Sequence, residues 1–328
     1  MGDPQPVLTP LSRAAIFLVL VIREGRESVV RDVLADLTAL QRTVGFRAPD
    51  GGLACVTGIG SMAWDRLFAG PRPAELHPFR ELAGPRHRAV STQGDLLIHL
   101  RAARMDLCFE MAGLIMDRLT GAATVVDETH GFAYFDERDL MGFVDGTENP
   151  TGQAAKVAVT SADPHFAGGS YVIVQKYLHD LTRWNALPVE AQELIIGRTK
   201  LSNVELPDDV KPPTSHVAST SLDDGREIMR FNMPFGEFGR GEFGTYFIGY
   251  SDSPSVTELM LERMFLGDAL SDGDRILDFS TAVTGTLFFA PTADFLDNLP
   301  DAPGAADVPM AQRETEQSLG VGSLKGSR

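Results

Sequence analysis

The order of its apolar segments, which repeats twice along the 328-residue chain, is the feature that most constrains the fold. Each half reads strand, helix, strand, strand, helix, strand, although the two halves do not share a sequence. Two such units predict an α+β protein of tandem ferredoxin-like halves with antiparallel sheets, of the dimeric α+β barrel type. We place the first half at residues 1–150 and the second at residues 151–298.

The first half opens with the apolar run AAIFLVLVI at residues 14–22, which predicts a buried strand. This run is too short to span a bilayer and lacks the basic flank and cleavage site of a signal peptide. We therefore expect a cytoplasmic protein without a membrane segment. The other elements expected in this half are a helix at 27–43, strands at 53–59 and 95–102, a helix with Cys108, Met111, Ile115 and Leu119 on its apolar face, and a strand at 124–135.

The second half is followed by a segment of different character. Its expected elements are strands at 170–178, 215–222, 227–232, 244–250 and 284–290, a helix at 189–196, and a helix capped by Ser253 with Pro254 at its first position. Residues 299–328 are rich in Pro, Ala and charge and have almost nothing to bury, so we expect a disordered linker.

Composition excludes several classes of protein. The net charge is −16 and no long Lys/Arg run occurs, which argues against nucleic-acid binding. Cys55 and Cys108 form neither a metal knuckle nor a disulfide framework. The segment GIGSMA at residues 58–63 fits a dinucleotide fingerprint, but no second parallel strand with a terminal acidic residue follows it, so we set NAD binding aside.

The segment GFVDGTENP at residues 142–150 concentrates glycines and an Asn–Pro step, which predicts a loop with a demanding backbone. One interpretation is a tight turn between the halves, in which Asp145 and Asn149 cap backbone groups. The other is the wall of a pocket, because loops between two halves are where pockets form.

Metal-ligand motifs are missing from the sequence, but one pair of polar residues is suggestive. The seven histidines show no HExxH, CxxCH or paired spacing, so zinc hydrolysis and covalent haem attachment have no support. In MRFNMPFG, Arg230 and Asn232 are two residues apart and would share one face of a strand. Facing a cavity, they would stabilise charge on a small oxygen species; the alternative is an exposed strand face.

Together with SHVAST, which contains His216, these segments resemble the dye-decolourising (DyP-type) haem peroxidases, in particular their shorter bacterial branch. The GFVDGTENP loop matches that family's GxxDG signature. The segments QKYLHD, IGRTKL, FGTYFIGY, MLERMFLG and LDFSTAVTGTLFF are also similar, so the resemblance covers roughly residues 10–297.

The resemblance implies a non-covalent haem b in the C-terminal half and a peroxidase that reduces H2O2 and oxidises an organic reductant. His216 would be the axial iron ligand, with Asp274 or Asp278 holding its other ring nitrogen. On the opposite face, Asp145, Arg230 and Asn232 would contact peroxide. A haem carrier, a haem iron-removing (deferrochelatase-like) protein and an inactive cargo protein remain alternatives.

The last residues, SLGVGSLKGSR, are similar to the peptide that loads such peroxidases into encapsulin shells. Leu319, Val321 and Leu324 would dock into an apolar groove of the shell and so place the protein in an encapsulin compartment. The family also implies homodimers that build toward a hexamer. The sequence leaves open the physiological reductant, oxidation of Mn2+, and a relay through Tyr134, Tyr177, Trp64 or Trp184.

Overall fold

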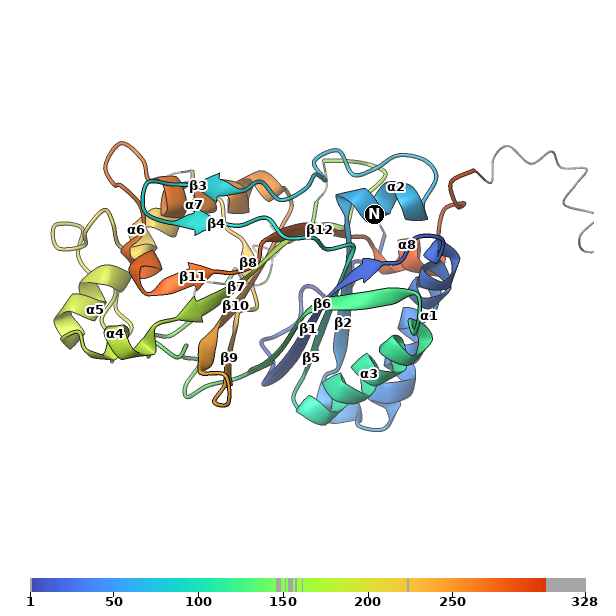
Figure 1. Cartoon of the computed structure of the whole chain (residues 1–328), viewed down its shortest axis with the longest axis horizontal. Coiled ribbons are helices and arrows are strands. Elements are labelled where there is room, and N and C mark those ends of the chain that lie inside the picture. The colour runs from blue at the N-terminus through green and yellow to red at the C-terminus, as the bar shows by residue number, and fades with distance from the viewer. Residues whose placement is uncertain are drawn as a thin grey trace, which may run out of the picture.

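The computed structural model describes residues 2–145, 149–150, 152, 156, 158–160, 162–222 and 224–304. It has the α+β architecture that the sequence predicts, and every strand pair in the described residues is antiparallel. In Figure 1 most of the first half lies on the right and most of the second half on the left, but residues 82–89 lie against the second half and residues 293–297 against the first. No helix within the described ranges is both long and apolar enough to cross a membrane.

The first half contains six strands and three α-helices in its described part. They are β1 (Ala14–Ile22), α1 (Glu27–Phe46), β2 (Ala54–Gly60), α2 (Ser61–Leu67), β3 (Leu82–Ala83), β4 (Arg88–Ala89), β5 (Leu96–Ala102), α3 (Met105–Arg118) and β6 (Ala123–Phe132). The predicted strand at residues 14–22 is confirmed, and eight of its nine residues are buried. Both of its faces are covered, which explains a continuous apolar run instead of alternation.

The second half follows the same scheme with additional short elements. They are β7 (Ser170–His179), α4 (Leu181–Asn185), α5 (Val189–Ile196), α6 (His216–Thr220), β8 (Met229–Arg230), β9 (Met233–Glu237), β10 (Glu242–Ser251), α7 (Pro254–Leu266), a 3-10 helix (Arg275–Asp278), β11 (Ser280–Ala282), β12 (Thr286–Ala290) and α8 (Ala293–Asp297). Helix α7 begins as predicted, with Ser253 at its N-cap and Pro254 in its first turn.

One sheet joins the two halves. Its order is β6-β1-β5-β2 in the first half and β12-β7-β10-β8 in the second. If these four strands are numbered 1 to 4 along the chain in each half, both halves have the same spatial order, 4-1-3-2. The halves meet where β2 pairs with β12, at Gly60–Phe288 and Ile59–Phe289. At Gly58 an added Cβ would lie 2.8 Å from the Cβ of Phe288, so this glycine of the GIGSMA segment allows close strand packing.

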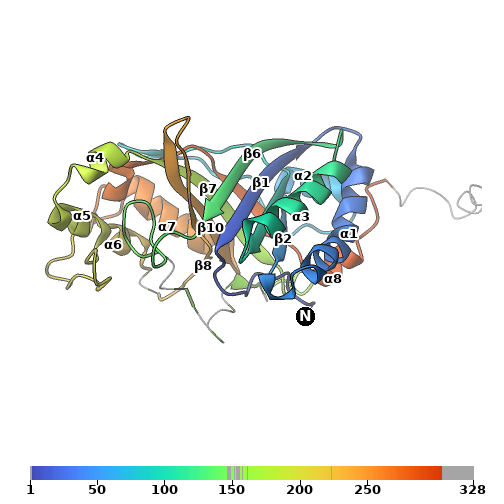
Figure 2. The same cartoon turned by 90° about the horizontal axis from the view of Figure 1, so that it is seen from below.

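The sheet curls until β6 at one edge contacts β9 near the other, and the two lie close together in Figure 2. Its concave face encloses a buried cluster that includes Phe17, Val56, Val172, Tyr246 and Phe288, which we call the barrel interior. The convex face is covered by helices, with α1 and α3 against the first half and α7 against the second (Figure 1).

Two sequence predictions were wrong around the second half's short elements. Residues 215–222 were expected to be a strand, but they contain helix α6, because the Ser215 side chain caps it by accepting a hydrogen bond from the backbone N–H of Ala218. The strand expected at residues 227–232 is limited to Met229–Arg230, and the next strand begins at Met233; between them the backbone N–H of Phe231 donates to the carbonyl of Ile248 at 3.2 Å.

The contact between β6 and β9 gives a test of the closed barrel. A Cβ added at Gly131 would lie 2.4 Å from the Cβ of Met233, and neither backbone can move without breaking its sheet. We expect Gly131→Ala to lower the free energy of unfolding by about 1–3 kcal/mol, as overpacking usually does. Gly239→Ala, where an added Cβ meets nothing within 4 Å, is the control. Equal midpoints for both variants in urea unfolding would contradict this packing.

Candidate active site

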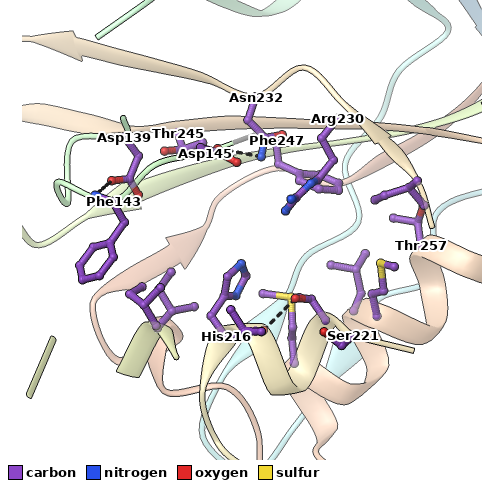
Figure 3. A pocket seen from close by; sticks show the side chains of 18 of the residues that line it. Asp139, Phe143, Asp145, His216, Ser221, Arg230, Asn232, Thr245, Phe247 and Thr257 are labelled. Carbon is purple, nitrogen blue, oxygen red and sulfur yellow. Dashed lines mark hydrogen bonds between the residues drawn. The ribbon is translucent and has the colours of Figure 1, made fainter. Parts of the chain in front are cut away.

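A cavity of about 330 Å³ lies between helices α6 and α7 and the strands β7 and β10. Figure 3 shows His216 pointing from α6 across this cavity toward Arg230, which comes from the opposite wall together with Asn232 and Asp145. Apolar side chains line much of the rest: Ile196, Val217, Leu222, Ile228, Phe247, Met260, Leu261, Met264 and Ile276. A mainly apolar cavity with a few convergent polar groups is typical of a cofactor site.

His216 is held from behind by a buried carboxylate. Its Nδ1 lies 2.7 Å from Oδ2 of Asp274, whose side chain is fully buried. Oδ1 of Asp274 accepts a hydrogen bond from the backbone N–H of Ile276 at 2.9 Å, which fixes the carboxylate. Because a carboxylate accepts, Nδ1 carries the proton and Nε2 keeps its lone pair. Burial lowers the pKa of His216, but the charge and hydrogen bond of Asp274 outweigh burial and the pKa is raised.

The alternative carboxylate, Asp278, and the other histidine of the cavity, His179, are both hydrogen-bonded to other groups. Oδ1 of Asp278 accepts hydrogen bonds from Arg86 at 2.5 Å and from His87 at 3.0 Å. His179 also lines the cavity, but its ring nitrogens contact Ser280 at 2.7 Å and Thr245 at 3.0 Å. Burial lowers the pKa of His179 to about 4, so its ring is neutral. Of the two histidines that line the cavity, His216 is therefore the one with a ring nitrogen available to a metal.

Asp145 is held by a backbone bond and a side-chain bond. Its N–H donates to the carbonyl of Glu137 at 2.8 Å, and its Oδ2 accepts from Nδ2 of Asn232 at 3.0 Å. Oδ1 of Asn232 in turn accepts from the backbone N–H of Ile248 on β10 at 3.1 Å. Asn232 thus links Asp145 to the sheet and orients its carboxylate.

Asn149 ties the 142–150 loop to Arg230. Its Oδ1 accepts from the backbone N–H of Arg230 at 2.8 Å, and its Nδ2 donates to the carbonyl of Arg230 at 2.6 Å. Asn149 thus bonds backbone groups, as one interpretation of this loop expects, whereas the side chain of Asp145 lines the cavity, as the other expects. Arg230 and Asn232 also both line the cavity, although a regular strand covers only the first of them.

Asp139, a second carboxylate in the cavity wall, was not predicted, because no motif in the sequence marks it. Its Oδ1 accepts from the backbone N–H of Phe143 at 3.0 Å, which closes the turn before Asp145 (Figure 3). Burial, and then the charge of Asp145, raise the pKa of Asp139 to about 7. Asp139 therefore keeps its proton to a higher pH than an ordinary carboxyl does.

This arrangement places an imidazole with an unprotonated ring nitrogen across one cavity from a carboxylate and a guanidinium. An imidazole backed by a carboxylate is a basic metal ligand. A carboxylate and a guanidinium on the facing wall can move a proton and stabilise developing negative charge. Such a set fits the activation of a small oxygen substrate.

Two family models together match most of the chain. Residues 4–133 match the N-terminal domain of Dyp-type peroxidases, and residues 136–295 match the C-terminal domain.

Individual proteins are similar over the same range. A dye-decolorizing peroxidase of Rhodococcus erythropolis is 63% identical over 99% of this chain and 97% of its own. The cryo-EM structure of the encapsulated DyP-type peroxidase from Mycobacterium smegmatis is 61% identical, with a TM-score of 0.90 over 92% of this chain and 100% of its own. A DypB variant from Rhodococcus jostii RHA1 in complex with haem is 56% identical, with a TM-score of 0.88 over 90% of this chain and 99% of its own. The chain therefore belongs to the Dyp-type peroxidase family.

Proposed function

We propose that this protein is a haem-dependent peroxidase, which reduces H2O2 by cleaving its O–O bond and oxidises organic one-electron donors such as dyes and phenols. One observation carries the proposal: His216, backed by Asp274, faces Arg230, Asp145 and Asn232 across a single cavity. The related DypB structure in complex with haem supports haem b as the cofactor.

The residues of the cavity fit a non-covalent haem. His216 offers an Nε2 lone pair, and its side chain is 27% exposed, into a cavity with a mainly apolar lining. The haem would lie between residues of the predicted second half, 151–298, and the loop that ends the first half, 1–150. When bound, it would supply the iron that takes up peroxide and the ring that holds oxidising equivalents.

The chain's own groups carry out the proton and charge steps. Asp274 stabilises the Nδ1–H tautomer of His216 and raises the basicity of Nε2. Asp145 accepts a proton from H2O2 and returns it to the departing oxygen. Arg230 places a guanidinium where it stabilises the negative charge that develops as the O–O bond breaks. Asn232 holds the Asp145 carboxylate in place for both transfers.

A haem carrier and a haem iron-removing protein fit the site less well. A storage pocket gains nothing from a carboxylate and a guanidinium opposite the iron ligand. The closely related proteins named as peroxidases also favour turnover of peroxide over iron removal. An inactive cargo protein would need no such polar wall.

We expect Arg230→Leu to impair the reaction of the haem-loaded protein with H2O2 more than Asp145→Ala does. Water can replace a carboxylate as proton acceptor, whereas the loss of a preorganised charge costs about 10²- to 10³-fold in rate. Stopped-flow absorbance of the Soret band after one equivalent of H2O2 measures both variants. Arg240→Leu, an exposed residue paired with Glu237, is the control. A larger loss in Asp145→Ala would contradict this order of importance.

We further propose that residues 299–328 form a linker and an encapsulin-loading peptide. The disorder expected for this segment does not include its first residues, because Arg31 donates to the carbonyl of Pro300 at 2.6 Å and the N–H of Ala69 donates to that of Asp301 at 2.7 Å. Leu319, Val321 and Leu324 lie outside the described residues, so the proposal rests on the sequence of the tail and on the encapsulated relative. Three apolar residues among glycines and serines suit docking into a groove of a partner. The protein would then function inside an encapsulin compartment in the cytoplasm. The homodimer or hexamer implied by the family stays a prediction.

Replacing the three apolar residues by Ser tests this tail. The triple variant keeps the linker length, and truncation after Pro300 removes residues 301–328, so both should abolish co-purification with a co-expressed encapsulin shell. Peroxidase activity should persist in both, because neither change touches the cavity. Packaging equal to that of the unchanged protein in either variant would refute the assignment.

A further inference from the structure

Strand β10 separates the cavity from the barrel interior. Thr245 and Phe247 line the cavity, whereas Tyr246 and Tyr250, on the opposite face of the strand, are fully buried in the barrel interior. Phe231, between the cavity residues Arg230 and Asn232, is also buried in this interior. Aromatic groups therefore lie one strand away from the proposed haem site.

Tyr250 is hydrogen-bonded to a buried histidine. Its hydroxyl lies 2.7 Å from Nδ1 of His99, and both side chains are fully buried. No other partner of the hydroxyl occurs in the described residues, and Nε2 of His99 has none. If the hydroxyl donates to Nδ1, the only group left without a partner is the N–H at Nε2 of His99. If Nδ1 instead donates to the hydroxyl, two groups lack a partner, the hydroxyl proton of Tyr250 and the lone pair at Nε2. The first arrangement leaves fewer unsatisfied groups, so the phenol faces a base.

The surroundings of this pair are aromatic and cationic. Phe17 stacks on His99 at 4.7 Å between centroids, and Phe231 meets Tyr250 edge-on at 5.8 Å. The guanidinium of Arg101 lies 3.8 Å from the centroid of the Phe231 ring. Burial, and then the charge of Arg101, lower the pKa of His99 well below its usual value, so its imidazole is neutral and a weak base, which takes up the phenolic proton only while the phenol is oxidised.

We propose that Tyr250 and His99 form a redox-active pair that holds one oxidising equivalent in the barrel interior. This inference rests on the proposed peroxidase function, because the oxidant is the haem after its reaction with H2O2. One electron passes from Tyr250 to the oxidised haem, and the phenolic proton moves to Nδ1 of His99, which leaves a neutral tyrosyl radical beside an imidazolium.

Both the electron transfer from Tyr250 and the proton transfer to His99 can be reversed. An electron from the organic donor, passed back through the haem, reduces the radical, and the proton returns from His99 to the phenolate oxygen. Arg101 and burial both disfavour the imidazolium, so they favour this return. Phe17 and Phe231 lack a hydroxyl and are much harder to oxidise than a phenol, so the oxidising equivalent stays on Tyr250 and does not move to these rings. The pair would hold an oxidising equivalent away from the cavity when the organic donor is scarce.

Tyr246 provides a matched control within the same strand. It is as deeply buried as Tyr250, lies on the same face of β10 and stacks on Phe17 at 4.1 Å. Its hydroxyl, however, has no hydrogen-bond partner among the described residues, and burial and the nearby charge of Asp127 raise its pKa well above the usual value. Because no acceptor is hydrogen-bonded to this phenol, we expect the radical on Tyr250 and not on Tyr246.

The experiment uses the haem-loaded full chain, treated with one equivalent of H2O2 without a donor, frozen within milliseconds and examined by electron paramagnetic resonance. A radical that narrows with ring-deuterated tyrosine should appear in the wild type and in Tyr246→Phe and be lost in Tyr250→Phe. Each variant removes a single hydroxyl, and its Soret band checks haem binding. In unsubstituted protein labelled with 15N-histidine, pulsed measurements should detect a histidine nitrogen coupled to the radical.

The outcomes separate this inference from the function on which it rests. A normal change of the Soret band with an equal tyrosyl signal in Tyr250→Phe, or with no histidine coupling, would overturn the Tyr250–His99 pair alone. A Soret band that does not respond to H2O2 would overturn the peroxidase function and the pair with it.

Discussion

The hydrogen bond between His216 and Asp274 is the interaction on which the rest of the site depends. A buried carboxylate needs a partner, and Asp274 has two, the imidazole and the backbone N–H of Ile276. The second bond fixes the carboxylate on the 3-10 helix, and the first turns the imidazole so that Nε2 faces the cavity. Removing Asp274 would leave α6 in place but free the ring to rotate.

The curled sheet explains how one chain can hold two chemically different compartments. Alternating side chains on β10 face the cavity and the barrel interior, so Phe247 and Tyr250 lie on opposite sides of one backbone. The wall opposite His216 is built by the pairing of Asn149 with Arg230 and of Asn232 with Asp145, which connects the loop between the halves to the sheet. Closure of the barrel and assembly of the site are therefore parts of the same packing.

Local sequence patterns predicted much of the fold, because the spacing of apolar residues indicates which face is buried and capping residues indicate where a helix begins. The apolar run of β1, the Ser253 cap of α7 and the order of both halves could be recognised in this way. Helix α6 could not, because in five residues the cap of Ser215 competes with the β-branched Val217 and Thr220. The break between β8 and β9 depends on the bonds of Asn232 to Asp145 and Ile248, which are distant in sequence.

The site residues likewise divide into those that local sequence identifies and those that only tertiary contacts identify. Asp145, Arg230, Asn232 and His216 belong to segments that stand out in the sequence, and all four line one cavity. Asp274 and Asp278 are only four residues apart, and only their tertiary partners distinguish them. Asp139 and the Tyr250–His99 pair carry no local signal, since burial in a folded sheet gives these groups their properties.

The most direct test of the account is the iron–imidazole stretching band in resonance Raman spectra of the reduced, haem-loaded protein. The wild type should show a band at the high frequency typical of a strongly basic imidazole, which moves to lower frequency in Asp274→Asn and disappears in His216→Ala. A band that persists in His216→Ala, or that Asp274→Asn leaves unchanged, would contradict the central claim that His216, held by Asp274, binds the haem iron.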